Sequence, residues 1–283
     1  MSGRANPWSF QEQAKAENER LVKNLISNKL FFDIKTVIYP LEDEYIFCAL
    51  LEQLCDDEWT DFLIIDVSTI PRTLSKNVYE TIYNYNLRGN GIIYFVYTLP
   101  ERYTHDQGLG PYEVGTLHIP SNVSGTQVSA IVFPGFGGYE AKNAFDMLSE
   151  LHSDIMVAWN CFEPDYLQAY NYQVGNYAIF DEFVNKRAHM TNYFSYNDAL
   201  RVFEEFFQVV KDRYDNDQTS KHSAIFAMFS YSWTYFLAAF TMQRIKNISD
   251  SIRTHMVFFP VHQYQTMYSH GVSQSIAFCI EDE

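Results

Sequence analysis

The sequence predicts an α/β protein with a Rossmann-like, mostly parallel, doubly wound sheet built from two related halves. Apolar runs such as FLIID (62–66) and SAIFAM (223–228), typical of strands buried on both faces, alternate with stretches of helical periodicity. This alternation implies parallel strands joined by right-handed helical crossovers. In addition, one pattern occurs twice, because the segment 62–110 recurs as 223–271.

Each copy of this repeat runs from an apolar strand through a serine-containing turn and a helix to a second apolar strand. A tyrosine follows, and a glycine comes seven residues after it: Tyr103 and Gly110 in the first copy, Tyr264 and Gly271 in the second. In open α/β sheets, ligands bind where strand ends, helix N-termini and loop amides converge. The repeat therefore predicts a site at the loops of both copies.

We expect three parts along the chain: a helical lead over 1–35, a first half over 36–160 and a second half over 161–283. The middle stretch 162–191 is tyrosine-rich and expected to be irregular. The expected strands are 36–40, 62–66, 91–100, a short edge piece at 116–120, 128–133, 154–160, 223–229, 254–259 and 275–280. Helices are expected from about 10 to 27, over 42–59, from about 69 to 87, after the glycine turn at 135–138, from 195 to 214 and from about 232 to 247.

The composition excludes several functions. The formal net charge is −15, with 35 acidic against 20 basic residues, so broad nucleic-acid binding is not expected. The four cysteines and eight histidines show no metal-ligand spacing. No apolar run approaches the roughly 20 residues that span a bilayer, and the sequence starts without an apolar signal segment. We therefore predict a cytoplasmic protein without a metal and without a membrane partner.

The first strand of the first copy ends in a group of polar residues: Asp66, Ser68, Thr69 and Arg72. A carboxylate at this position can accept a hydrogen bond from a ribose hydroxyl or act as a general acid or base. The hydroxyls and amides of the next turn can hold an anion. Alternatively, Asp66 caps the following helix and Arg72 pairs with it.

A glycine turn lies between a predicted strand and a predicted helix, where nucleotide-binding turns occur. It contains Gly135, Gly137 and Gly138, but Glu140 occupies the place of the third glycine in the dinucleotide fingerprint. Glu140 would repel a pyrophosphate, yet it can bind a ribose or act as an acid or base. Alternatively, the turn only allows close packing of helix on sheet.

Aromatic residues and a histidine are predicted beyond the second strand of each copy: Tyr97, Tyr103, Tyr264 and His270. A tyrosine on a loop above the sheet can stack on a nucleobase, and histidine can donate a hydrogen bond to phosphate. The alternative is that the tyrosines pack the loops onto the sheet.

The turn MFSYSWTY opens the helix of the second copy and places Ser230 in the predicted site. A serine-hydrolase turn is disfavoured, because the glycines of G-x-S-x-G are absent and Phe229, Tyr231 and Trp233 are expected to crowd the bend. One serine of this turn is expected to cap the helix and the other to face the cleft.

Four segments together resemble an uncharacterised family of two-half, Rossmann-like bacterial proteins found in antiphage-defence and mobile gene neighbourhoods. They are IIDVSTIPR, VYTLPERY, VFPGFGGYEAKNAFDML and FFPVHQYQTMYSHG. The family has no established activity to transfer. Its second turn is typically a glycine-proline-lysine loop, and here MFSYSWTY replaces it, so no lysine is available there for phosphate.

These observations lead to one expected function and two alternatives. The expected function is a component of an antiphage system that recognises a nucleotide or nucleotide-derived molecule in a cleft between the halves. The first alternative is a non-catalytic interaction subunit of a larger defence complex, for example with an ATPase. The second is a hydrolase of a nucleotide or glycosidic bond that uses Asp66 or Glu140.

Overall fold

The structure is a computed structural model of the 283-residue chain. It describes residues 20, 62–68, 70, 77–81, 92–98, 102–103, 121–123, 125–134, 139–151, 154–160, 188–193, 196–229, 232–257, 269–270 and 275–279. The predicted helical lead over 1–35 lies outside the described residues except for Arg20, which is helical.

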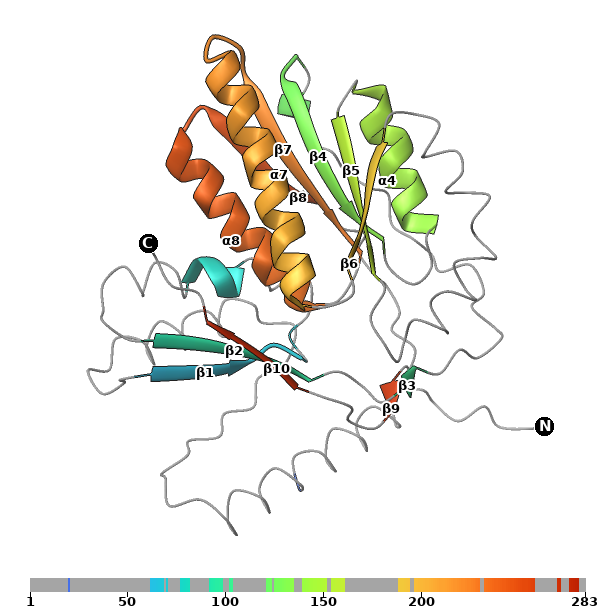
Figure 1. Ribbon diagram of the computed structural model, residues 1–283, viewed down its shortest axis with the longest axis vertical. Coiled ribbons are helices and arrows are strands. Elements are labelled where there is room, and N and C mark those ends of the chain that lie inside the picture. The colour runs from blue at the N-terminus through green and yellow to red at the C-terminus, as the bar shows by residue number, and fades with distance from the viewer. Residues whose placement is uncertain are drawn as a thin grey trace, which may run out of the picture.

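A five-stranded parallel sheet forms the larger part of the described fold (Figure 1). Its order is β6-β5-β4-β7-β8, and every neighbouring pair is parallel. The strands are β4 (Gln127–Phe133), β5 (Asp154–Asn160), β6 (Ala188–Tyr193), β7 (His222–Met228) and β8 (Ile252–Val257). Counted in chain order, this is the sequence 3-2-1-4-5 that characterises Rossmann-type sheets.

Helices cover both faces of this sheet. Helix α4 (Tyr139–Glu150) lies on one face, and α7 (Tyr196–Asn216) and α8 (Ser232–Ile248) lie together on the other (Figure 1). Successive strand residues alternate between the faces: Val132 packs in the α4 cluster and Phe133 in the α7–α8 cluster. The predicted mixed α/β class with parallel strands is confirmed, and the arrangement is compatible with a Rossmann-like fold.

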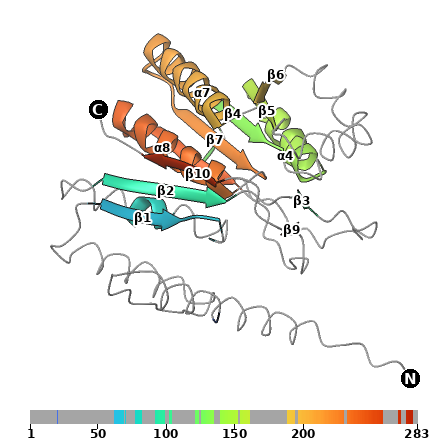
Figure 2. The same ribbon diagram turned by 60° about the horizontal axis from the view of Figure 1, so that its bottom comes forward.

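A second, three-stranded sheet contains β1 (Phe62–Asp66), β2 (Ile92–Thr98) and β10 (Ser275–Cys279) in the order β1-β2-β10. It lies against α8 on the side away from the five-stranded sheet (Figures 1 and 2). Phe95 of β2 and Phe236 of α8 meet with ring centroids 5.2 Å apart, and Lys246 pairs with Glu80 at 3.7 Å. Helix α8 is therefore buried between two sheets, which explains why it is apolar around most of its circumference.

The two repeat copies form similar units in different sheets. In the first copy Phe62 pairs with Ile92, and in the second His222 pairs with Ile252, both in parallel and with the same sequence separation. The expectation that both copies belong to one sheet is therefore wrong. The predicted boundary at residue 160 also falls inside the five-stranded sheet, which joins residues 127–160 to residues 188–257.

Two further differences concern strands. Ala188–Tyr193 forms β6, although the stretch up to Thr191 was expected to be irregular. The alternation of small, polar and aromatic residues in AHMTNY gives no continuous apolar run, and pairing with β5 determines the structure instead. The final strand β10 exists as predicted but pairs antiparallel to β2, so the chain end returns to the sheet of the first copy.

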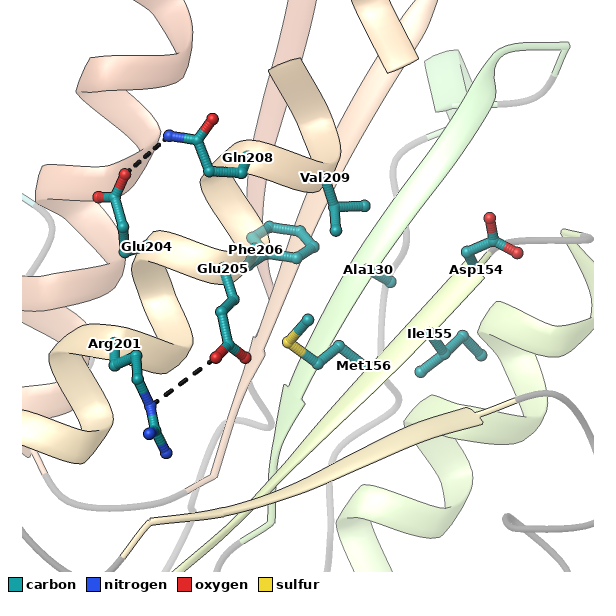
Figure 3. Close-up of a pocket in the computed structure, with 10 residues that line it drawn as sticks. All are labelled: Ala130, Asp154, Ile155, Met156, Arg201, Glu204, Glu205, Phe206, Gln208 and Val209. Carbon is teal, nitrogen blue, oxygen red and sulfur yellow. Dashed lines mark hydrogen bonds and ion pairs between the residues drawn. The ribbon is translucent and has the colours of Figure 1, made fainter. Parts of the chain in front are cut away.

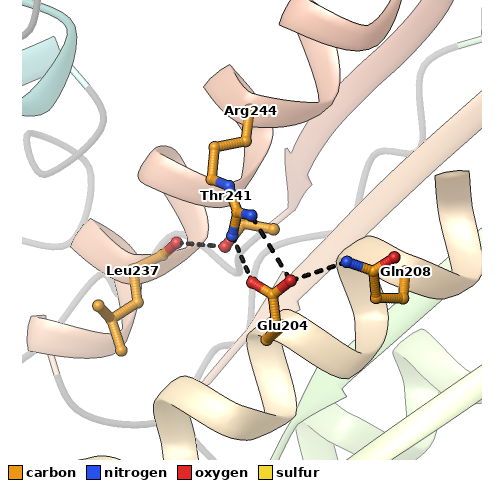
Figure 4. Close-up of polar contacts among 5 residues, drawn as sticks. All are labelled: Glu204, Gln208, Leu237, Thr241 and Arg244. Atoms are coloured by element: carbon orange, nitrogen blue, oxygen red, sulfur yellow. Dashed lines mark hydrogen bonds and ion pairs between the residues drawn. The ribbon is translucent and has the colours of Figure 1, made fainter. Parts of the chain in front are cut away.

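Helices α7 and α8 are also joined by polar contacts (Figure 4). The guanidinium of Arg244 donates to Glu204 at 2.5 Å and lies 4.1 Å from the ring centroid of Phe207. Gln208 donates to the same carboxylate at 2.9 Å. The hydrogen bond from Arg244 is the largest influence and lowers the pKa of Glu204; burial opposes it with a smaller effect, and the hydrogen bond from Gln208 lowers the pKa further.

We expect Glu204→Gln to lower stability at pH 7 by less than about 1 kcal/mol, because the pair is half exposed and screened by solvent. Since the folded-state pKa lies below the unfolded one, this contribution is present above the unfolded pKa and is lost as pH falls through the folded pKa. Urea unfolding at several pH values between about 6 and 3 measures it.

The control is Glu205→Gln, which removes an exposed pair with Arg201 at 3.7 Å. This variant should change the free energy of unfolding less than Glu204→Gln does at pH 7. If the difference in the free energy of unfolding between wild type and Glu204→Gln grows as the pH falls, the lowered pKa of Glu204 is contradicted.

Candidate functional site at the carboxyl edge of the five-stranded sheet

The carboxyl ends of β4 and β7 are held together at the centre of the sheet. The N–H of Phe229 donates to the carbonyl of Phe133 at 2.9 Å, which continues the pairing one residue beyond β7. The hydroxyl of Tyr235, in the first turn of α8, donates to the carbonyl of Met228, the last residue of β7. The β7–α8 connection therefore leaves the sheet from a fixed position beside the end of β4.

This pair of strand ends is the topological switch point of the sheet. From β4 the chain crosses to β5 by way of α4, whereas from β7 it crosses to β8 on the opposite side by way of α8. Connections that diverge from neighbouring strands leave room between them, and ligands of doubly wound sheets bind there. Helices α4 and α8 both begin at this edge, so their N-termini lie there.

The predicted glycine turn belongs to the connection between β4 and α4, directly at the switch point. Gly135, Gly137 and Gly138 themselves lie outside the described residues. Pro134 is buried before the turn, and Tyr139 and Glu140 are the first two residues of α4. The chain order thus places the glycines where the phosphate-binding turn of a Rossmann fold occurs, after the strand that is first in the 3-2-1-4-5 order.

The second predicted group lies at the end of β1. Asp66 accepts hydrogen bonds from the N–H of Ser68 at 2.8 Å and from its hydroxyl at 2.5 Å, and the Ser68 hydroxyl accepts from the N–H of Thr98 at 2.8 Å. Ser68 therefore connects the ends of β1 and β2, which is a structural role. Asp66 is exposed, while Thr69 and Arg72 lie outside the described residues.

The aromatic candidates separate into a core residue and loop residues. Tyr97 lies within β2 and is only 7% exposed, so it belongs to the core and not to a loop above the sheet. Tyr103 lies in β3 (Arg102–Tyr103), which pairs antiparallel with β9 (Ser269–His270). The loops of the two copies therefore meet, with His270 opposite Arg102. Tyr264 lies outside the described residues.

Of the three aromatic residues expected to crowd the serine turn of the second copy, the structure describes two, Phe229 and Trp233. Phe229 is buried in the cluster on the α4 face, and Trp233 is buried in the cluster on the α7–α8 face. Both aromatic side chains therefore point into the protein, away from the connection between β7 and α8. Ser232 is the first residue of α8, and Ser230 and Tyr231 lie outside the described residues.

The opposite, amino edge of the sheet carries a structural network. Arg213 donates to the carbonyl of Val128 and the hydroxyl of Ser129, both at 3.0 Å, and pairs with Asp154. Asp217 accepts from the backbone N–H and hydroxyl groups of Thr219 and Ser220, which lowers its pKa. These groups are used in joining helix, turn and strands, so we do not place the site at this edge.

The larger of the two described cavities does not lie at the switch point either. It has a volume of about 710 Å³ and lies between α7 and β4–β5 (Figure 3). The charged side chains that line it form ion pairs within the protein: Glu205 pairs with Arg201, Glu204 with Arg244 and Asp154 with Arg213. It offers a ligand an apolar surface without an available charge, so we favour the switch point, where helix N-termini converge.

One aromatic residue at the carboxyl edge was missed by the analysis of the sequence. Tyr196, the first residue of α7, meets Trp233 with ring centroids 5.4 Å apart. The sequence drew attention to Ser195 as a helix start, and the repeat directed the search to the strand loops. The available signal was an aromatic residue at the start of a long amphipathic helix.

Within the described ranges, no three His, Cys, Asp or Glu side chains gather as a metal site would require. The helices of the same ranges include none with the length and apolar character needed to cross a bilayer. The strand order of the five-stranded sheet and the connections at its carboxyl edge define a doubly wound parallel α/β protein. Its switch point lies between β4 and β7. The chain matches no family model and no curated protein.

Proposed function

We propose that the protein binds a nucleotide or nucleotide-derived small molecule at the carboxyl edge of the five-stranded sheet, between the β4–α4 and β7–α8 connections. The observation that carries the proposal is the strand order β6-β5-β4-β7-β8, which makes β4 and β7 the switch point, with three glycines in the turn that follows β4. Glycine without a side chain lets the backbone approach a phosphate closely.

The two repeat copies support a cleft to which both contribute. The arrowheads of β2 and β7 point toward the same part of the molecule in both views (Figures 1 and 2). The pairing of Tyr103 with Ser269 brings the loop of the first copy against that of the second. In this arrangement the exposed carboxylate of Asp66 is the first copy's candidate for contact with a ribose hydroxyl.

Isothermal titration calorimetry with AMP, ATP and NAD⁺ tests the proposal. We expect one of the three to bind in a 1:1 ratio and to raise the melting temperature, since a ligand at about 100 times its Kd stabilises the folded state by about 2.7 kcal/mol. If the folded protein binds none of them and none shifts the melting temperature, the proposal is wrong.

The wider role, as a component of a bacterial antiphage system, rests on the family resemblance. It is tested by infecting a host that carries or lacks the gene together with its neighbouring genes. Equal plating of all phages tested on the two hosts would remove this role while leaving the ligand proposal unaffected.

A second candidate function, acyl transfer to a serine, is favoured by one observation. The side chains of Phe229 and Trp233, which were expected to crowd the β7–α8 turn, are buried in the two core clusters, and this supports room for a nucleophile in the turn. A serine there, Ser230 or Ser232, would attack an ester carbonyl, pass its proton to a base such as His262 and release the alcohol, and water would then hydrolyse the acyl-serine. Amides of the β4–α4 turn would stabilise the oxyanion.

A fluorophosphonate probe distinguishes this candidate from simple binding. We expect the probe to label one site per chain. If Ser230→Ala or Ser232→Ala abolishes this labelling and neither control, Ser220→Ala or Ser223→Ala, does so, the nucleophile is established. Absence of labelling in the folded wild type would exclude it, whatever the nucleotide titration shows.

A further inference from the structure

The position of Tyr196 follows from the aromatic contacts of α7. Phe203, two turns further along this helix, stacks on Phe133 with centroids 4.7 Å apart and planes 13° apart. Phe133 is the last residue of β4. The helix face that carries Phe203 is thereby fixed over the carboxyl end of this strand.

Tyr196 lies on the same face of α7, because seven residues are close to two full turns. It is about 10 Å nearer the start of the helix than Phe203. Since α7 runs antiparallel to the strands it covers, its first residue, Tyr196, belongs to the end of the helix that lies at the carboxyl edge of the sheet (Figure 1). Its contact with Trp233 places it beside the β7–α8 connection as well.

Tyr196 is partly exposed, unlike the residues behind it. Phe203 is 3% exposed and Trp233 is fully buried, whereas Tyr196 is partly buried and packs against their cluster. Burial raises the pKa of its phenol, so the side chain stays neutral and does not repel a phosphate at any ordinary pH. A neutral, half-buried aromatic ring at a strand edge is suited to stacking on a planar, anionic ligand.

We infer that Tyr196 is a binding residue of the switch-point site and forms the aromatic wall against which the base of a bound nucleotide stacks. The inference rests on the proposed function and adds to it a preference for ligands with a planar base. It also gives α7 a part in the site, beside the two connections that the strand order identifies.

The test compares Tyr196→Ala, Tyr196→Leu and Tyr196→Phe in calorimetric titrations with AMP, ATP and NAD⁺. Stacking on a base corresponds to about a 5- to 100-fold change in Kd. We expect this loss in the alanine and leucine variants and a change of less than about twofold in the phenylalanine variant, which keeps the ring. Ribose 5-phosphate, which has no base, should bind wild type and Tyr196→Leu equally.

Tyr214→Ala is the matched control, because Tyr214 lies on the same helix at the opposite edge of the sheet and packs on His222 at 5.7 Å. It should lower the melting temperature without changing Kd.

If the wild type binds a nucleotide and Tyr196→Ala and Tyr196→Leu bind it equally well, the inference is wrong and the proposed function stands. If the folded wild type binds none of the three nucleotides, both are wrong. Tyr196→Leu keeps apolar bulk against Trp233, so a folding failure of the alanine variant does not prevent the decision.

Discussion

Replacing Phe236 by alanine is expected to lower the free energy of unfolding by about 3–5 kcal/mol. Phe236 is fully buried in α8, and its ring meets Phe95 of the three-stranded sheet at 5.2 Å. Because α8 is enclosed by a sheet on each side, the space left by the ring cannot be filled by movement of a surface segment. Urea unfolding followed by circular dichroism measures the loss as a lower midpoint with an unchanged slope.

Phe240→Ala is the matched control for this prediction. Phe240 lies one turn further along the same helix but is only partly buried, with Arg244 at 5.7 Å from its ring centroid. Its truncation should cost clearly less than that of Phe236. Equal losses in the two variants would mean that α8 is not enclosed by two sheets.

A double-mutant cycle isolates the contact between the two sheets. Phe95→Ala and Phe236→Ala should show a coupling energy of about 0.5–1.5 kcal/mol, as expected for an aromatic pair in contact. Additive effects would show that the three-stranded sheet packs elsewhere. The cycle therefore tests the placement of the first repeat copy, on which a cleft shared by both copies depends.

Local sequence predicted most of the described elements because their signals are local. FLIID and HSAIFAM are continuous apolar runs, and both are strands with the expected parallel partners. The helix of 196–216 has a strong amphipathic stripe, with six buried residues on one face. The glycine-rich segment after Phe133 was correctly placed between a strand and a helix.

Strand partners were less predictable because they depend on contacts far apart in sequence. Nothing in SIAFC distinguishes a parallel from an antiparallel neighbour, and β10 pairs antiparallel with β2. Nor does the similarity of the two repeat copies reveal that they belong to separate sheets. Both outcomes involve residues that are far apart in sequence, so local patterns do not reveal them.

The same limit applies to the candidate site. The strand ends and the glycine turn were identified from sequence order alone, since the carboxyl ends of parallel strands share one edge. The burial of Tyr97 was missed, because the penultimate residue of a strand can point to either face. Tyr196 was missed because its contact is with Trp233, which is distant from it in sequence.

Gly137→Val is expected to abolish nucleotide binding or to weaken it at least about tenfold, which corresponds to 1.4 kcal/mol or more. In the proposed site, the glycines of the β4–α4 connection would let the backbone amides reach a phosphate without an intervening side chain. A branched side chain at this position occupies the space into which the phosphate would come. Calorimetric titration with AMP, ATP and NAD⁺ measures the affinity, and circular dichroism verifies that the variant is folded.

Gly125→Ala provides the control, because Gly125 lies before the same strand at the amino edge of the sheet. It has a φ of 77°, and an added Cβ would meet nothing within 4 Å. The alanine is therefore expected to cost about 1–2 kcal/mol of backbone strain and to leave Kd unchanged. The two variants thus separate a loss of stability from a loss of the binding surface. A Gly137→Val protein that binds the nucleotide as tightly as wild type would show that the ligand does not approach the β4–α4 connection, and the switch point would no longer be the place of the site.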